Sequence, residues 1–186
     1  MTMVTILTIL PEGFEEIEAI TPIDIWRRAG FEVTVASLNA PRLVSGRSDI
    51  VVQADTSLAE LEADLVYDLI FLPGGPGVKR LRSSSKITEI IKRRDAAGRF
   101  IAAICAAPLV LKDAGLLERR KYTAHPSTET ELNEILSIQS VVVDGNLITS
   151  RGAGTSVVFA LKVVEILAGV NLAQKVGLSI CAEVVS

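Results

Sequence analysis

Cys105 lies where one apolar run ends and another begins. The residues Phe100 to Ile104 have the character of a buried strand, and a helical apolar pattern starts after Pro108. A cysteine at such a strand-to-helix turn has the setting of a nucleophile elbow, and the following helix would stabilise its thiolate. The alternative is a small buried hydrophobic residue, which is the common role of a free cysteine. The strand-end position favours a reactive centre, and Cys181 lacks this setting.

His125 is the only histidine in the chain. It follows the short apolar run Tyr122–Ala124 and precedes a proline, which predicts a loop at the edge of a sheet. A lone histidine is more often structural than catalytic. If a histidine assists Cys105, however, it must be this one.

Glu18 is the third candidate for catalysis. On a helix it borders the apolar stripe that starts at Phe14, whereas Glu15 and Glu16 project into solvent. A carboxyl group beside the core has a raised pKa because burial disfavours its charge. The protonated group could then donate a hydrogen bond to a thiolate or an oxidised sulfur. The alternative, a salt-bridged surface glutamate, agrees equally well with the spacing.

Gly74 and Gly75 follow another buried strand and allow the backbone to approach a ligand closely. Their amides, together with that of Ala106, could form an oxyanion hole, although a flexible turn is the plainer interpretation. Neither this segment nor Arg151–Gly154 matches a dinucleotide or P-loop motif. We therefore expect no cofactor. The two cysteines form no metal-binding pattern, so we also expect no structural metal.

The elements that must position these residues alternate between strands and helices. The predicted strands are Val4–Leu10, Phe31–Ser37, Asp68–Leu72, Arg99–Ile104, Tyr122–Ala124 and a hairpin that turns at Asp144–Asn146. The predicted helices run from Phe14 to just before Gly30, over Lys86–Ala97, from Ala106 to near Gly115, from Ser127 or Thr128 to Ile135, and over Ser156–Leu167. The first carries an apolar stripe at Phe14, Ile17, Ile20, Ile23 and Trp26. This alternation predicts a doubly wound α/β fold with a mostly parallel sheet.

Length and composition limit the class of protein. The chain has 186 residues, 49% of them hydrophobic, and we expect a single domain over 1–186. The formal net charge of -3 argues against nucleic acid as the main partner. No apolar run is long enough to span a membrane. A pair of cysteines without a disulfide framework favours a cytoplasmic location.

Seven segments together resemble the ThiJ/PfpI superfamily, and specifically its Parkinson disease protein deglycase and YajL-like branch. The similarity covers essentially the whole chain. The segments are Gly13–Glu18, Pro22–Asp24, Arg27–Gly30, Leu72–Gly75, Ala102–Pro108, Thr123–Pro126 and Thr149–Ser156. Each is weak alone, whereas their combination and order are specific.

The resemblance implies a flavodoxin-like homodimer of the class I glutamine amidotransferase-like type, with its reactive cysteine on the elbow. It also implies that Glu18 bonds the sulfur of Cys105 and that His125 lies beside it. Members of this branch are described as glyoxalase III enzymes or deglycases, as oxidative-stress sensors through cysteine sulfinate, and as redox-dependent chaperones.

Two hypotheses follow from the residues and the resemblance. In the first, Cys105 attacks methylglyoxal, glyoxal or their adducts without a cofactor and yields 2-hydroxy acids, with Glu18 as general acid and base. In the second, Cys105 is a redox sensor that stops at the sulfinic acid. An amidase of the wider superfamily would require an acid partner for His125, and the sequence offers none.

Overall fold

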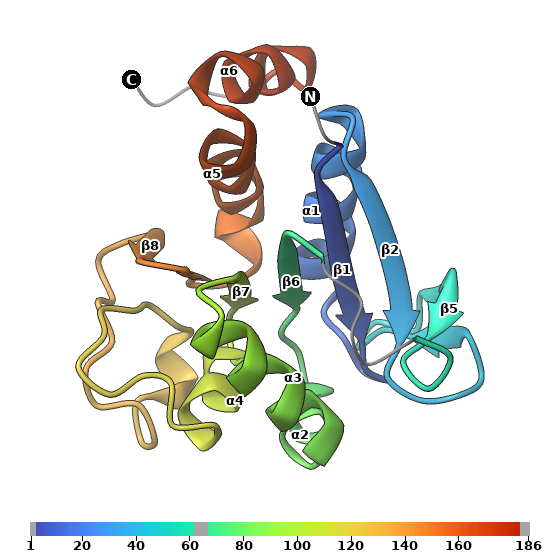
Figure 1. The fold of residues 1–186 in the computed structure, drawn as a ribbon, viewed down its shortest axis with the longest axis vertical. Helices are drawn as coiled ribbons and strands as arrows, with labels where there is room; N and C mark the ends of the chain where they lie inside the picture. The colour runs from blue at the N-terminus through green and yellow to red at the C-terminus, as the bar shows by residue number, and fades with distance from the viewer. Residues whose placement is uncertain (1–2, 62–66, 183–186) are drawn as a thin grey trace.

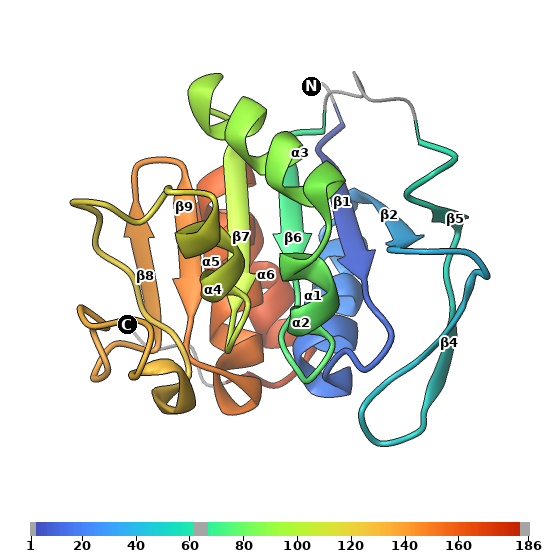
Figure 2. The same cartoon turned by 90° about the horizontal axis from the view of Figure 1, so that it is seen from below.

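The computed structural model describes residues 3–61 and 67–182. A seven-stranded sheet forms its centre, in the order β5-β2-β1-β6-β7-β9-β8 (Figure 2). Every neighbouring pair in this sheet is parallel except β8 and β9. The strands are β1 (Thr5–Leu10), β2 (Glu32–Ser37), β5 (Thr56–Ser57), β6 (Leu69–Leu72), β7 (Phe100–Ile104), β8 (Val141–Asp144) and β9 (Leu147–Ser150). A separate antiparallel hairpin consists of β3 (Leu43–Ser45) and β4 (Val51–Gln53).

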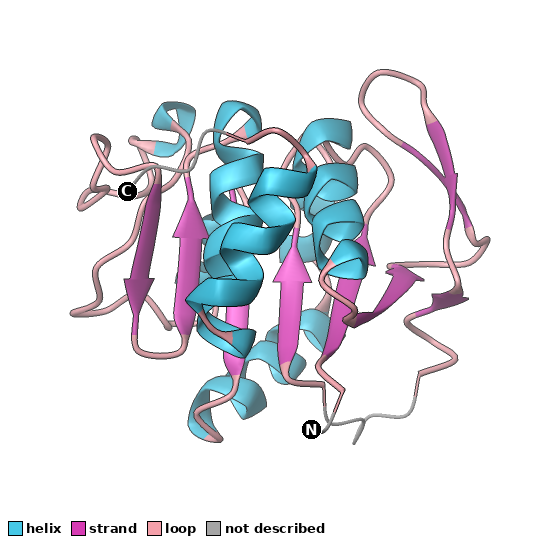
Figure 3. Ribbon diagram, turned by 90° about the horizontal axis from the view of Figure 1, so that it is seen from above, coloured by secondary structure: helices cyan, strands magenta, loops and turns pink. Residues whose placement is uncertain are grey.

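Helices cover both faces of the sheet, which confirms the predicted doubly wound α/β fold (Figure 1). One face carries α1 (Glu16–Arg28), α5 (Ser156–Ala168) and α6 (Val170–Ser179), which lie in front of the strands in Figure 3. The other face carries α2 (Val78–Arg82), α3 (Ser85–Ala96) and α4 (Pro108–Asp113).

The central strands divide their side chains between two cores. In β7, Ala102 and Ile104 pack into the core under α1 and α5, whereas Ile101 and Ala103 pack into the core under α3 and α4. This alternation follows from the two-residue period of a strand. Because both faces are covered, the strand reads as a continuous apolar run, which is why the sequence predicted it well.

Helix α1 differs from the predicted amphipathic pattern. Ile17 and Ile20 were expected in the apolar stripe, yet their exposed fractions are 54% and 39%. Glu16 was expected in solvent, yet it is buried, and its Oε1 accepts a hydrogen bond of 2.7 Å from the Ser48 amide. The buried apolar face instead ends in Ile23, Ile25 and Trp26. The prediction failed because helical spacing does not show which side of a helix is covered. The β3–β4 hairpin covers Glu16, whereas Ile17 and Ile20 stay exposed.

The segment before β8 also differs from expectation. Tyr122–Ala124 is not a strand, because only Tyr122 forms an isolated bridge, to Ile135. The helix predicted from Ser127 or Thr128 to Ile135 is reduced to a single 3₁₀ turn, Pro126–Thr128. His125 therefore lies on an irregular loop.

Candidate active site

The carboxyl ends of β6 and β7 bring together the residues that the sequence singled out. The two strands are parallel neighbours, with Leu72 paired to Ala103. Gly74 and Gly75 follow β6, and Cys105 follows β7. Ligand sites in open α/β sheets form at this edge.

Cys105 occupies a strained backbone position between strand and helix. Its φ is +65°, which is uncommon for a residue other than glycine. Two backbone hydrogen bonds maintain this conformation: the Cys105 amide donates to the Ser150 carbonyl oxygen, and the Cys105 carbonyl oxygen accepts from the His125 amide, each at 2.9 Å. The second bond also places His125 next to the cysteine.

Glu18 reaches the cysteine from the first turn of α1. The Glu15 side chain caps this helix by accepting from the Glu18 amide at 2.8 Å, and the Glu15 amide donates to the Gly74 carbonyl oxygen at 3.0 Å. These contacts hold the start of α1 against the loop after β6. The side chain of Glu18 is consequently 1% exposed and hydrogen-bonded to Cys105.

Burial raises the pKa of Glu18 to about 7. The hydrogen bond with Cys105 and the backbone amides of Gly74 and Ala153 oppose this effect, whereas the nearby charge of Glu15 adds to it. Beyond these contacts, its Oε2 atom has no hydrogen-bond partner in the described part of the chain. Glu18 is thus a carboxyl group that exchanges its proton near neutral pH.

The pKa of the Cys105 thiol is raised, whereas the sequence predicted that the following helix would lower it. Burial, the charge of Glu18 and the hydrogen bond with it raise the pKa of Cys105 to about 12, while the amides of Gly75 and Ala106 lower it. The expected help from a helix is weak, because α4 begins only at Pro108 and has six residues. Protonation of Glu18 removes its negative charge and lets the carboxyl donate to the sulfur. The Cys105 thiolate is therefore more stable when Glu18 is protonated.

The two glycines after β6 face different groups. A Cβ at Gly74 would lie 2.3 Å from Glu18 Oε2 and 2.5 Å from the Cys105 Cβ, so only glycine fits there. The Gly74 amide faces the Glu18 carboxyl, whereas the amides of Gly75 and Ala106 face the sulfur. The amides suited to hold an oxyanion beside Cys105 are thus those of Gly75 and Ala106.

His125 is oriented by its neighbour Ser127. Its Nδ1 accepts from the Ser127 amide at 3.2 Å and lies 2.8 Å from the Ser127 hydroxyl oxygen. A neutral imidazole that accepts at Nδ1 carries its proton on Nε2, so its remaining nitrogen is a donor. This arrangement suits binding of a substrate oxygen better than removal of the Cys105 proton.

A pocket of about 370 Å³ opens above the sulfur. Cys105, Ala106, Gly75 and His125 are among the residues that line it. Several charged side chains line the remainder: Arg47, Lys79, Arg82 and Glu131. Among the described residues, no three histidine, cysteine, aspartate or glutamate side chains cluster so as to hold a metal ion.

Residues after β9 also border the site, and the sequence pattern did not single them out as site residues. Gly152 lies close to both candidate partners, because a Cβ there would be 3.4 Å from His125 Cδ2 and 3.6 Å from Glu18 Oε1. The Thr155 hydroxyl lies 2.7 Å from that of Ser150 and accepts from the Gly152 amide, which shapes this turn. The glycine-rich segment after β9 was the available signal. It was tested as a nucleotide motif and used for the family resemblance, but no residue in it was named as a site residue.

Comparison with known proteins agrees with this fold. The sequence pattern of the DJ-1/PfpI family matches residues 4–166. Protein dj-1beta of Drosophila melanogaster is 43% identical over 174 residues, which cover 91% of this chain and 92% of the relative. Glutathione-independent glyoxalase DJR-1.2 of Caenorhabditis elegans is 35% identical, with 86% of each chain covered. The structure of oxidized Toxoplasma gondii DJ-1 superposes with a TM-score of 0.91 at 35% identity, over 97% of this chain and 99% of that one.

The fold is an α/β sheet that carries a cysteine elbow and a buried glutamate at its carboxyl edge, and this combination indicates the class of protein. The chain belongs to the DJ-1/PfpI family. Within the described residues, no helix is both long enough and apolar enough to cross a bilayer.

Proposed function

We propose that this protein is a cofactor-independent glyoxalase or deglycase that converts methylglyoxal, glyoxal or their adducts into 2-hydroxy acids. The observation that carries this proposal is the buried Glu18, whose pKa is about 7 and which bonds the sulfur of Cys105 at the floor of a pocket. A carboxyl group that titrates near neutrality can accept and return a proton within one catalytic cycle. The relative named as a glyoxalase supports the same assignment.

The proposed reaction balances without an external oxidant. The Cys105 thiolate adds to the aldehyde carbon and forms a hemithioacetal, whose oxygen is held by the amides of Gly75 and Ala106. Glu18 gives its proton to this oxygen and becomes a carboxylate. It then takes the proton from the first carbon and returns it to the neighbouring carbon, while the hydroxyl proton passes to the neighbouring oxygen. The first carbon is thereby oxidised to a thioester and the second is reduced to an alcohol. Water hydrolyses the thioester, which releases the 2-hydroxy acid and restores the thiol. His125 binds a substrate oxygen through its Nε2 proton.

Removal of the nucleophile tests this function. We expect Cys105→Ala to reduce lactate formation from methylglyoxal to the uncatalysed rate, measured in a buffer without free thiols. The matched control is Cys181→Ala, because Cys181 is exposed and distant in sequence from the pocket residues. Lactate formation by Cys105→Ala at the wild-type rate would contradict the mechanism.

A second function, redox sensing through Cys105, is favoured by the same contacts. Peroxide oxidises a thiolate to the sulfinic acid in two steps, each adding one oxygen atom and releasing water or hydroxide. The Glu18 carboxyl and the amides of Gly75 and Ala106 can donate hydrogen bonds to the sulfinate oxygens. Such a sensor would act in the cytoplasm, where the resting thiol is kept reduced.

Mass spectrometry after mild peroxide treatment tests this second function. We expect a gain of two oxygen atoms that maps to Cys105, and loss of that selectivity in Glu18→Ala. Equal oxidation of Cys105 and Cys181 in the wild-type protein would contradict it.

We further propose that the protein forms a homodimer through α1. Ile17 and Ile20 lie one turn apart on this helix and are exposed by 54% and 39%. The adjacent hairpin exposes Ile50 and Val51 to a similar extent. Neighbouring exposed apolar side chains of this kind are typical of a surface that another protein covers.

A further inference from the structure

The charged residues around the Cys105 pocket do not balance one another. Arg82 is fully engaged: it binds both carboxylate oxygens of Asp113 at 2.6 and 3.0 Å and those of Glu131 at 3.0 and 2.7 Å. Arg82, its two carboxylates and Lys112, which lies 4.0 Å from Glu131, therefore form an ion-pair network with no net formal charge beside the pocket. A guanidinium held by two carboxylates has little positive charge left for a ligand.

Arg47 and Lys79 line the same pocket but lack such partners. Among the ion pairs within residues 3–61 and 67–182, none involves either side chain. Arg47 lies at the turn of the β3–β4 hairpin, where its amide donates to the Phe14 carbonyl oxygen at 2.8 Å. Its backbone is thus fixed close to the start of α1.

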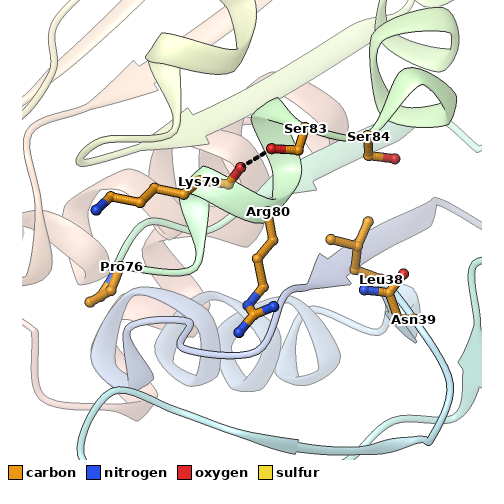
Figure 4. A pocket seen from close by; sticks show the side chains of 7 residues that line it. All are labelled: Leu38, Asn39, Pro76, Lys79, Arg80, Ser83 and Ser84. Atoms are coloured by element: carbon orange, nitrogen blue, oxygen red, sulfur yellow. Dashed lines mark hydrogen bonds between the residues drawn. The ribbon is translucent and has the colours of Figure 1, made fainter.

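Lys79 and its neighbour Arg80 leave α2 in different directions (Figure 4). Both border a second hollow of about 620 Å³ that Cys105 does not line, together with Leu38 and Asn39. Of these two cations, Lys79 also lines the pocket that contains Cys105, and Arg80 does not. Arg80 instead borders the loop after β2 with Asn39 and Pro41. The two residues therefore offer a matched pair of cations, one inside the pocket and one outside it.

We infer that the preferred substrate of Cys105 is an aldehyde that carries an anionic oxygen group, a carboxylate or a phosphate, and that Arg47 and Lys79 bind this group. This inference rests on the proposed function and defines its substrate class. The aldehyde carbon would lie against the sulfur, with the anion at the wall formed by the hairpin turn and α2. Positive charge at a pocket rim both attracts and orients an anionic ligand.

The charges of the groups around Cys105 are compatible with an anionic ligand. Glu18, when protonated, adds no negative charge beside the sulfur. Arg82 and Lys112, which lies 4.0 Å from Glu131, together balance the charges of Asp113 and Glu131. An anionic substrate would therefore meet two uncompensated cations and no uncompensated carboxylate among these residues. A neutral aldehyde such as methylglyoxal would gain nothing from Arg47 or Lys79.

Kinetic selectivity tests the inference. The substrates are methylglyoxal, 4,5-dioxopentanoate as a carboxylate-bearing oxoaldehyde, and hydroxypyruvaldehyde phosphate as a phosphate-bearing one. We expect kcat/KM to be higher for at least one anionic substrate than for methylglyoxal. The ratio of these two kcat/KM values should fall about fivefold in Lys79→Gln or Arg47→Gln, because each variant loses one partly exposed charge pair. Arg80→Gln should leave the ratio unchanged. The substrate with the larger dependence on Lys79 identifies the anion.

An alkylation experiment separates this inference from the proposed function. Iodoacetate is anionic and iodoacetamide is neutral, and both modify Cys105 without turnover. We expect the ratio of their rates at Cys105 to fall in Lys79→Gln and Arg47→Gln but not in Arg80→Gln, and to fall with added salt in the wild-type protein. If the ratio responds in this way while no oxoaldehyde is converted, the proposed function fails and the anion site stands. If Lys79→Gln and Arg47→Gln both leave the kcat/KM ratio and the alkylation ratio at their wild-type values, the anion site is refuted.

Discussion

At the scale of single residues, the Cys105–Glu18 pair determines the reactivity of the site. Each group alone has its charged form disfavoured by burial. Between about pH 7 and 12 the pair holds one proton. When that proton lies on Glu18, it removes the repulsion that a thiolate would feel. The site is therefore suited to chemistry in which a thiolate and a carboxylic acid are needed at the same moment.

The raised pKa of Glu18 predicts a specific dependence of stability on pH. The folded protein retains this proton up to about pH 7, whereas the unfolded chain loses it near its ordinary value of 4.5. The native state thus binds the extra proton between these values, so its stability falls as pH rises from about 4.5 to 7 and then levels off. Removing the acid in Glu18→Gln should raise the free energy of unfolding relative to wild type by roughly 3 kcal/mol more at pH 8 than at pH 5.

Urea denaturation of both proteins across this pH range measures the effect. Glu89→Gln is the control, because Glu89 is an exposed carboxylate on α3. A difference between Glu18→Gln and wild type that stays constant with pH would show that Glu18 is ionised throughout in the folded protein.

At the scale of elements, the turn after β6 sets the distance between α1 and the elbow. Gly74 allows the backbone to pass between the Glu18 carboxyl and the Cys105 side chain. The strand, the helix and the elbow can meet only because no side chain intervenes there. A glycine between two strand ends thus has a packing role in addition to any role of its amide.

Substitution of this glycine should disturb the site strongly. In Gly74→Ala the new methyl group would overlap Glu18 and Cys105, so we expect a loss of about 1–3 kcal/mol in stability together with the loss of Cys105-dependent activity. Gly154→Ala is the matched control, since a Cβ at Gly154 meets nothing within 4 Å. Thermal denaturation and the methylglyoxal assay compare the two variants. Equal behaviour of the two would disprove the packing role of Gly74.

At the scale of the whole molecule, the covered sheet leaves one side of α1 exposed. The proposed dimer accounts for the two isoleucines on this side, which the amphipathic pattern had assigned to the core. A dimer built on this surface would bring the β3–β4 hairpin, and with it Arg47, close to the interface.

Charge placed on this surface should separate the subunits. We expect Ile17→Lys and Ile20→Lys to shift the sedimentation coefficient from that of a dimer to that of a monomer, because a lysine ammonium group is costly to bury without a partner. Ile138→Lys changes an isoleucine that is 92% exposed on the loop before β8 and should have no such effect. A wild-type protein that sediments as a monomer would refute the proposed dimer.

Much of the fold was predictable because its central strands are buried on both faces. Such strands appear in the sequence as the apolar runs 69–72 and 100–104, the first followed by Pro73 and Gly74 and the second by Cys105. The irregular region of Tyr122–Ile135 was not predictable. Its path depends on contacts with distant elements, such as the bond from the Thr123 amide to the Thr149 hydroxyl.

The sequence by itself determined the chemical groups of the site and the sheet edge at which they meet. It identified Cys105 at a strand end, Glu18 near the apolar stripe, His125 on a loop and two glycines after a neighbouring strand. Only the tertiary structure decided the direction of the thiol pKa, the burial of Glu16, the exposure of Ile17 and the set of cations at the pocket. These properties depend on which distant segments exclude water from a group or leave it exposed. The spacing of residues along the chain does not predict which segments these are.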